Sequence, residues 1–183
     1  TKTMACDFTG GRVEACKESV GGLRNLYIAN FNSAMYDALT LGSDDEITGL
    51  GSAITTYKFE LRGENNSFEE TNENSRDNGT SFWTQSGAIS LKVQDAASQK
   101  QLKLLSYGRP HVIIEDYNGN FRIAGAQNGV EFSVSTSTGS AMGDLNGYNI
   151  TFEGKELSPS SFIDSAIMGD AAGFVIDTAL MNA

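Results

Sequence analysis

The chain has very little of the chemistry on which most active sites depend. Its 183 residues include one histidine, two cysteines and two prolines. With a single histidine, a Cys/His zinc site would have to recruit carboxylates as well. The two cysteines, Cys6 and Cys16, do not make a disulfide framework, and the sequence leaves open whether they are bonded to each other. No catalytic, cofactor-binding or metal-binding residue is therefore predicted.

Long apolar runs and cationic stripes are also missing. No run reaches the ~18 residues that a membrane-spanning helix needs, and the first residues have no apolar core of the signal-peptide type. The sequence predicts no membrane partner and a chain that is made and assembled in a cytoplasm. The formal charge of −10 argues against a protein that grips DNA through phosphate contacts. DNA could still pass nearby, since a negative wall repels phosphates; alternatively, the acidity only keeps the protein soluble.

The motifs of common enzymes are absent. There is no Gly-x-Ser-x-Gly elbow, no phosphate-binding loop and no dinucleotide fingerprint. His111 could act as a base with Glu115 or Asp116, but its place within an apolar run favours an ordinary strand histidine. The turns that begin at Asp116 and Asp144 lack the spacing of a calcium loop. The chain is therefore predicted not to be an enzyme.

What the chain does have is a series of strand patterns joined by glycine-rich turns. Apolar or alternating segments recur at 23–31, 53–62, 80–94, 110–134 and 148–152. Asn-Gly pairs at 118–119 and 128–129 predict hairpins, because both residues of such a turn need φ > 0. The pattern predicts a mainly β protein, a sandwich or barrel formed by residues 23–157.

One helix is predicted beside these strands, over about 95–105. Asp95 is placed to cap it and Gly108 to end it. Ala97, Gln101, Leu104 and Leu105 have helical spacing, so they are predicted to form the stripe that lies on a sheet.

Three segments are predicted to lie outside the core. Residues 1–22 form an N-terminal arm. The very polar segment 63–79 is either a long exposed loop or a ribbon that orders only against a neighbour. Residues 158–183 form an apolar C-terminal arm, which folds back or docks on another subunit; docking is favoured.

The order of these elements resembles that of the major tail tube proteins of tailed bacteriophages. The stretches 16–23, 107–121 and 141–148 are similar to segments of structural proteins from phages that infect Bacteroidetes-type bacteria, and the similarity covers most of residues 5–157. The resemblance implies a β-sandwich or barrel with one flanking helix. It further implies hexameric rings whose inner strands form one continuous barrel, and which stack into a hollow tube, bridged by an extended loop and terminal arms.

The same resemblance implies partners and a location. The partners are other copies of the chain, tail completion, tape-measure and baseplate-type proteins, and phage DNA that passes through a negative lumen without specific binding. The location is the virion tail, assembled in the host cytoplasm. Glu60, Glu115 and Glu131 are the candidate lumen carboxylates, as they lie on the expected wet faces of strands.

Two other functions remain open at this stage. The chain could be a capsid-decorating or head–tail connector protein, which would bind preformed heads. It could also be a carbohydrate-binding β-sandwich, with Trp83, Tyr117 and Tyr148 as stacking platforms, although aromatic residues in strands are more often part of the core.

Overall fold

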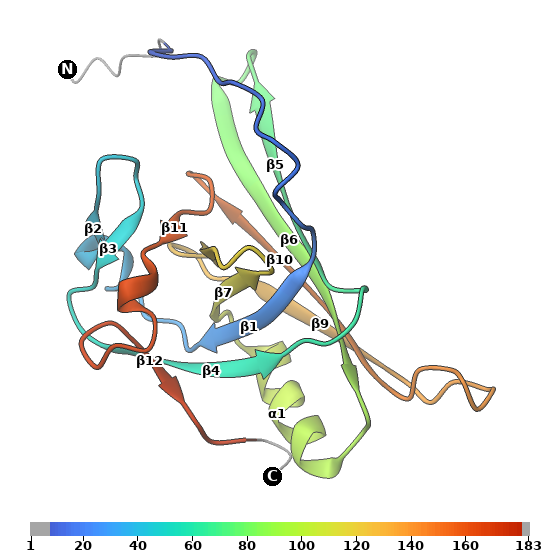
Figure 1. Cartoon of the computed structure of the whole chain (residues 1–183). Coiled ribbons are helices and arrows are strands. Elements are labelled where there is room, and N and C mark those ends of the chain that lie inside the picture. The colour runs from blue at the N-terminus through green and yellow to red at the C-terminus, as the bar shows by residue number, and fades with distance from the viewer. Residues whose placement is uncertain (1–7, 181–183) are drawn as a thin grey trace.

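The computed structural model describes residues 8–180, which form two β-sheets and one α-helix (Figure 1). Sheet A has eight strands in the order β12-β4-β1-β7-β8-β11-β3-β2, and sheet B has four in the order β5-β6-β10-β9. The prediction of a mainly β, two-sheet fold with one helix is confirmed.

The strands of sheet A are β1 (Leu23–Ala29), β2 (Thr40–Leu41), β3 (Ile47–Gly49), β4 (Ile54–Glu60), β7 (His111–Asp116), β8 (Phe121–Ala124), β11 (Phe162–Ile163) and β12 (Phe174–Asp177). Those of sheet B are β5 (Ser67–Ser75), β6 (Thr80–Lys92), β9 (Glu131–Ser137) and β10 (Gly147–Glu156). The helix is α1 (Ala96–Tyr107), and two single-turn 3-10 helices are η1 (Tyr36–Ala38) and η2 (Ser165–Ile167).

Sheet A is buried on both faces. One face packs on sheet B through a core that includes Leu26, Ile114 and Phe152, and the other is covered by its own loops around Ile113 and Phe174. The central strands β1 and β7 are therefore buried along almost their whole length. Sheet B is buried on one face only, so from Tyr148 onward β10 alternates between buried and exposed residues.

The two Asn-Gly pairs have different roles, and neither forms the predicted two-residue hairpin turn. Only their glycines have positive φ, +83° at Gly119 and +75° at Gly129. Gly119 lies in the longer β7–β8 turn, where the Asp116 carboxylate accepts hydrogen bonds from two backbone N–H groups. Gly129 lies where the chain leaves sheet A and enters sheet B, so β8 and β9 do not pair. The ribbon predicted from Arg109 to Glu156 is therefore divided between the two sheets.

The helix forms where it was predicted, but it buries a different stripe. The Asp95 carboxylate accepts a hydrogen bond from the Ser98 N–H at 2.9 Å, and Gly108 follows the last turn. Ser98, Leu102 and Leu105 face the protein, whereas Ala97, Gln101 and Leu104 are exposed. Of the four residues predicted to face the sheet, only Leu105 does so. The prediction started the buried stripe at Ala97 and missed Leu102, which is the most buried residue of the helix. No helix among residues 8–180 is long and apolar enough to cross a bilayer.

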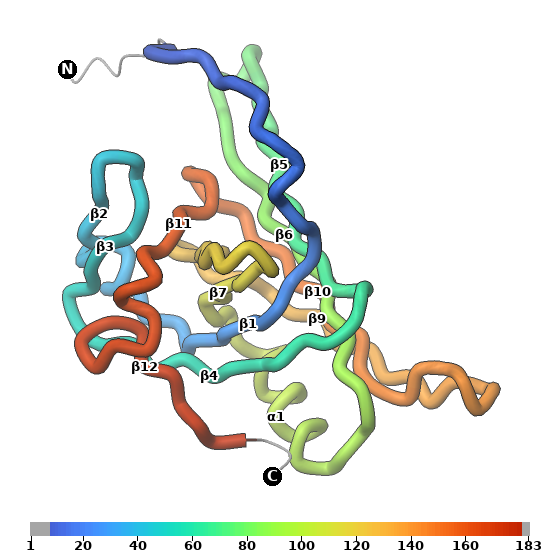
Figure 2. Tube along the Cα trace, in the orientation of Figure 1, coloured from blue at the N-terminus to red at the C-terminus, as the bar shows by residue number. Residues whose placement is uncertain are grey.

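The polar segment 63–79 is neither a loop nor a ribbon that needs a neighbour. Its residues 67–75 form β5, which pairs with β6 over nine residues. The β5–β6 hairpin projects from one end of the molecule, and the 138–146 loop projects from another (Figure 2). Residues 67–75 therefore form a strand because their backbone pairs with the long strand β6, although their polar composition is typical of a loop.

The two terminal segments behave differently. Residues 8–22 contain no helix or strand and are exposed throughout; residues 1–7, with Cys6, lie outside the described part, and Cys16 is exposed. The expected docking of 158–183 is wrong for its described strands. β12 pairs in parallel with β4, and β11 pairs with β3 and β8, which buries Phe174 and Ile163 in the chain's own core.

Candidate functional site

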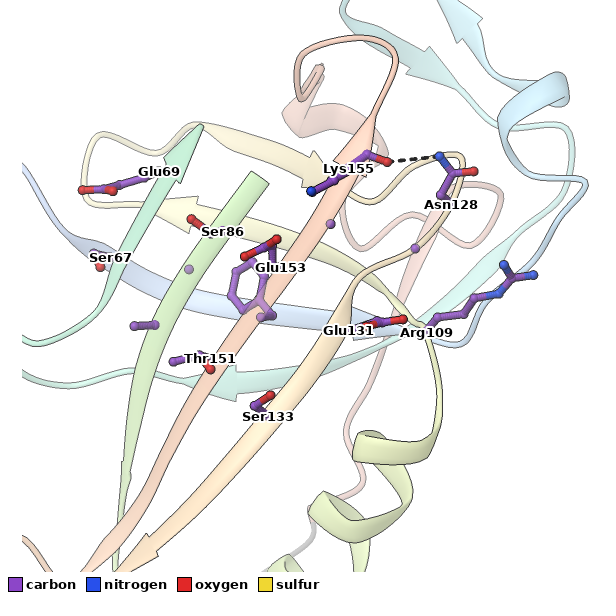
Figure 3. A pocket seen from close by; sticks show the side chains of 15 residues that line it. Ser67, Glu69, Ser86, Arg109, Asn128, Glu131, Ser133, Thr151, Glu153 and Lys155 are labelled. Carbon is purple, nitrogen blue, oxygen red and sulfur yellow. Dashed lines mark hydrogen bonds between the residues drawn. The ribbon is translucent and has the colours of Figure 1, made fainter. Parts of the chain in front are cut away.

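The outer face of sheet B is hollowed (Figure 3). It is an open groove of about 840 Å³. Strand alternation puts small polar residues and glutamates on this face, while Phe132, Ile150 and Phe152 point to the core. Its central lining residues are Ser67, Glu69, Ser86, Ala88, Glu131, Ser133, Thr151, Glu153 and Lys155.

Three glutamates lie in one row across this groove. Glu153 on β10 is directly opposite Glu131 on β9 and, on its other side, opposite Ser86 of β6. Ser86 is in turn opposite Glu69 on β5. Like charges directly opposite each other on a sheet are destabilising. The sequence therefore keeps a charge arrangement that stability alone would not favour.

The cations near this row are engaged with aromatic rings. The Arg109 guanidinium lies 4.0 Å from the centre of the Phe31 ring, and the Lys155 ammonium lies 5.4 Å from that of Phe82. Among the described residues, no ion pair joins either cation to a glutamate of the row. Both cations keep their charge, so the residues that line the groove carry three Glu against one Arg and one Lys, and the negative charge is concentrated in the row.

A buried polar network fixes the inner side of the same sheet to sheet A. Glu70 forms an ion pair with Arg122 at 3.1 Å, and its other oxygen accepts from the Gln85 amide at 3.0 Å and from the Ser160 N–H at 2.6 Å. Gln85 in turn accepts from the Gly125 N–H at 2.8 Å. The two sheets are thus joined by a largely buried hydrogen-bond network in which the Arg122 side chain is 32% exposed.

In the described part of the chain, the two side edges of sheet B have no outer partner strand, although α1 packs against β9. β5 and β9 are its terminal strands, and within residues 8–180 no strand pairs with the outer edge of either. All its pairings are antiparallel, so the four strands alternate in direction from one edge to the other. Such edges are templates for pairing with another chain.

The remaining sequence candidates do not assemble into a catalytic or sugar-binding site. His111 is fully buried; its Nε2 accepts from the Asn32 N–H, which leaves Nδ1 to donate to the Gly125 carbonyl at 2.7 Å. Burial lowers the pKa of His111 despite these hydrogen bonds. Tyr148 is 1% exposed and donates to a backbone carbonyl, so its ring is not a platform for a ligand. Tyr117 lies under the Arg24 guanidinium in the β7–β8 turn of sheet A, whereas Trp83 is on β6 of sheet B.

In the two turns that resemble calcium loops, the aspartate carboxylates accept hydrogen bonds from backbone N–H groups of the same turn. The Asp144 carboxylate accepts from the N–H groups of Ser140 and Ala141, which lowers its pKa. The Asp116 carboxylate is used in the same way within its turn. Residues 8–180 contain no group of three or more His, Cys, Asp or Glu side chains arranged to hold a metal ion.

The three carboxylates predicted to face a lumen lie in three different environments. Glu131 is in the acidic row. Glu60 is exposed on sheet A and paired with Arg62 at 2.9 Å. Glu115 was wrongly assigned to a wet face: it is buried and accepts from the Asn25 amide at 2.6 Å and the Tyr27 hydroxyl at 3.1 Å. The prediction missed Glu69 and Glu153, although the alternation in their strands could have identified them.

Neither a protein-family model, nor a curated protein, nor a solved structure matches this chain. Its function must therefore be inferred from the surface described above.

Proposed function

We propose that this chain is a structural subunit that polymerises into a hollow tube of the phage-tail type. In each hexameric ring, β9 of one copy pairs with β5 of the next, and the outer face of sheet B lines the lumen. The observation that carries the proposal is the form of sheet B: four long antiparallel strands, two edges that pair with no other strand of the described chain, and a polar, acidic outer face.

Strand direction supports closure into a ring. With four alternating strands, β5 and β9 run in opposite directions. In a ring whose axis follows the strands, β9 of one copy therefore meets β5 of its neighbour in antiparallel orientation, and the alternation continues around the ring. Closure removes every open edge. Six copies would supply roughly 24 strands, and barrels of that size leave an aqueous channel.

The chemistry of the outer face supports passage of DNA without binding. Four Ser or Thr and three Glu line the groove, against one Arg and one Lys, whereas proteins that bind DNA present several Lys and Arg to the phosphates. A negative wall weakens contact with a polyanion. In this proposal the chain belongs to the virion tail, and its further partners are tail completion, tape-measure and baseplate-type proteins.

Electron microscopy of the purified protein is the direct test. At high concentration, size-exclusion chromatography with light scattering should show ring-sized species, and negative-stain images should show rings or tubes with a central channel. A strictly monomeric protein that forms neither would overturn the proposal. Capture by preformed capsids without polymerisation would instead identify a decoration or connector protein.

A proline pair tests the edge contact itself. Along an antiparallel strand, successive N–H groups point alternately toward and away from the neighbouring strand. Of the variants Thr71→Pro and Asn72→Pro on β5, one therefore removes a hydrogen bond to β6 and the other removes an outward donor. The variant that removes the outward donor should keep the melting temperature of a folded monomer and lose ring formation. Normal rings from both variants would exclude β5 from the interface.

A further inference from the structure

The outward face of α1 is an unpartnered surface of mixed apolar and cationic character. Lys100, Lys103, Leu104 and Tyr107 have the i, i+3, i+4, i+7 spacing that puts them on one side of the helix, opposite Ser98, Leu102 and Leu105, which face the protein. Leu104 is 55% exposed and Tyr107 is 76% exposed.

This face is cationic in a protein that is acidic elsewhere. From Ala96 to Arg109 the sequence has three cations and no acidic residue. In the part of the chain that the structure describes, neither Lys100 nor Lys103 takes part in an ion pair. Both charges are therefore available to an acidic partner.

The turn between β2 and β3 has the complementary character. Asp44, Asp45 and Glu46 are all exposed, Leu41 beside them is 50% exposed, and there is no Lys or Arg between positions 24 and 58. The ion pairs of residues 8–180 do not involve these three carboxylates. The turn is closed by the Gly42 N–H, which donates to the Glu46 carbonyl at 2.8 Å, so the carboxylates are held on an ordered tip.

The two surfaces lie at opposite ends of the molecule. In Figure 1 the β2–β3 hairpin lies toward the end at which the β5–β6 hairpin projects, and α1 lies at the other end. β6 connects these ends, and its 13 residues span roughly 40 Å at about 3.3 Å per residue. The helix face and the acidic turn of one copy therefore do not meet, but head-to-tail copies bring them together.

We propose that the outward face of α1 docks on the acidic β2–β3 turn of a second copy in the next ring. The inference rests on the proposed tube, and it names the axial contact between rings. A head-to-tail contact of this kind is heterologous and propagates without end, as a tube requires. Leu104 and Tyr107 meet the apolar side of the turn around Leu41, while the lysines meet the carboxylates.

Charge reversal with compensation tests this contact. Lys100→Glu with Lys103→Glu should raise the protein concentration needed for tube growth at least about tenfold, since equivalent contacts around a ring act together. Rings should persist, because they close through other strands. Asp44→Lys with Glu46→Lys should have the same effect; Asp45 is left unchanged because its φ is +58°. The four changes in one chain should restore stacking.

A matched control and a direct contact assay complete the test. Lys58→Glu changes the charge at an exposed site on β4 and should leave tube length unchanged, in contrast to Lys103→Glu. Zero-length carbodiimide coupling of a mixture of isotopically light and heavy protein should yield mixed-isotope peptides that join Lys100 or Lys103 to residues 44–46.

The outcomes separate this inference from the proposed function. If wild-type protein forms tubes, but the reversed-charge variants stack equally well and no mixed-isotope link appears, then the axial contact lies elsewhere and the inference fails while the tube stands. If wild-type protein forms no rings or tubes, both fail. Loss of stacking in each double variant with rescue in the quadruple variant supports both.

Discussion

Glu131 and Glu153 face each other directly across the β9–β10 ladder, on the exposed face of sheet B. A cross-strand pair of like charges costs stability in the isolated subunit. The same pair contributes two of the three carboxylates in the acidic row. In the proposed tube this row would lie on the lumen wall and weaken contact with DNA, whereas in the monomer it only lowers stability.

Glu131→Gln should therefore stabilise the monomer. The expected gain is about 0.2–1 kcal/mol in the free energy of unfolding, because the substitution removes the repulsion and keeps the shape of the side chain. Urea denaturation at low ionic strength measures it, and the gain should shrink in 1 M salt. Glu60→Gln, which removes a carboxylate paired with Arg62, is the control and should give no gain. An unchanged or lower stability for Glu131→Gln would contradict the prediction.

Adjacent glutamates on β5 should respond very differently to truncation. Glu70→Ala leaves Arg122, Gln85 and the Ser160 N–H without their acceptor, so we expect a loss of about 3 kcal/mol or more, as for other broken buried pairs. Glu69→Ala, on the solvent face of the same strand, should cost within about 0.5 kcal/mol. Chemical denaturation of both variants measures the difference. Equal costs would mean that the network does not hold the sheets together.

The glycines of the two Asn-Gly pairs should also differ. At Gly119 a Cβ atom would meet nothing within 4 Å, so Gly119→Ala should cost only the left-handed backbone, about 1–2 kcal/mol; Gly119→Val should cost more, because a β-branched residue resists this conformation. At Gly129 a Cβ atom would lie 2.2 Å from the Arg109 carbonyl oxygen. Gly129→Ala should therefore destabilise the protein well beyond Gly119→Ala. Thermal melts of the two alanine variants compare them, and similar melting temperatures would argue against the tight corner between the sheets.

Tyr27 should make the protein sensitive to high pH. Burial, with the charge of Glu115 and a hydrogen bond to it, raises the pKa of Tyr27 to about 12 from its ordinary value of 10.0. Between those values the unfolded chain loses the phenol proton while the folded protein keeps it, so stability is fully present below pH 10 and falls as the pH rises toward 12. Ultraviolet titration should show one of the six tyrosines ionising later than the others.

Tyr27→Phe provides the control for that titration. The late step should disappear, and the stability advantage of the wild type over the variant should narrow between pH 10 and pH 12. A late step that persists in Tyr27→Phe would assign the raised pKa to another tyrosine.

Local sequence signals were sufficient for most individual elements. β1, β4, β7 and α1 form within a few residues of their predicted positions, since alternation, β-branched content and the Asp95 cap act over short distances. Among the lumen candidates, Glu131 could be identified by the same alternation. Glu115 could not, because its burial depends on Asn25 and Tyr27, which are about 90 residues away in the chain.

By itself, the sequence determined a mainly β chain with one capped helix, an excess of carboxylates and almost no catalytic chemistry. Only the tertiary structure decided which strands share a sheet. It divided the predicted ribbon at Gly129, paired the polar β5 with β6, and folded β12 back onto β4. These choices rest on backbone pairing and burial between segments far apart in the chain, and periodicity within a single segment carries no information about its partner.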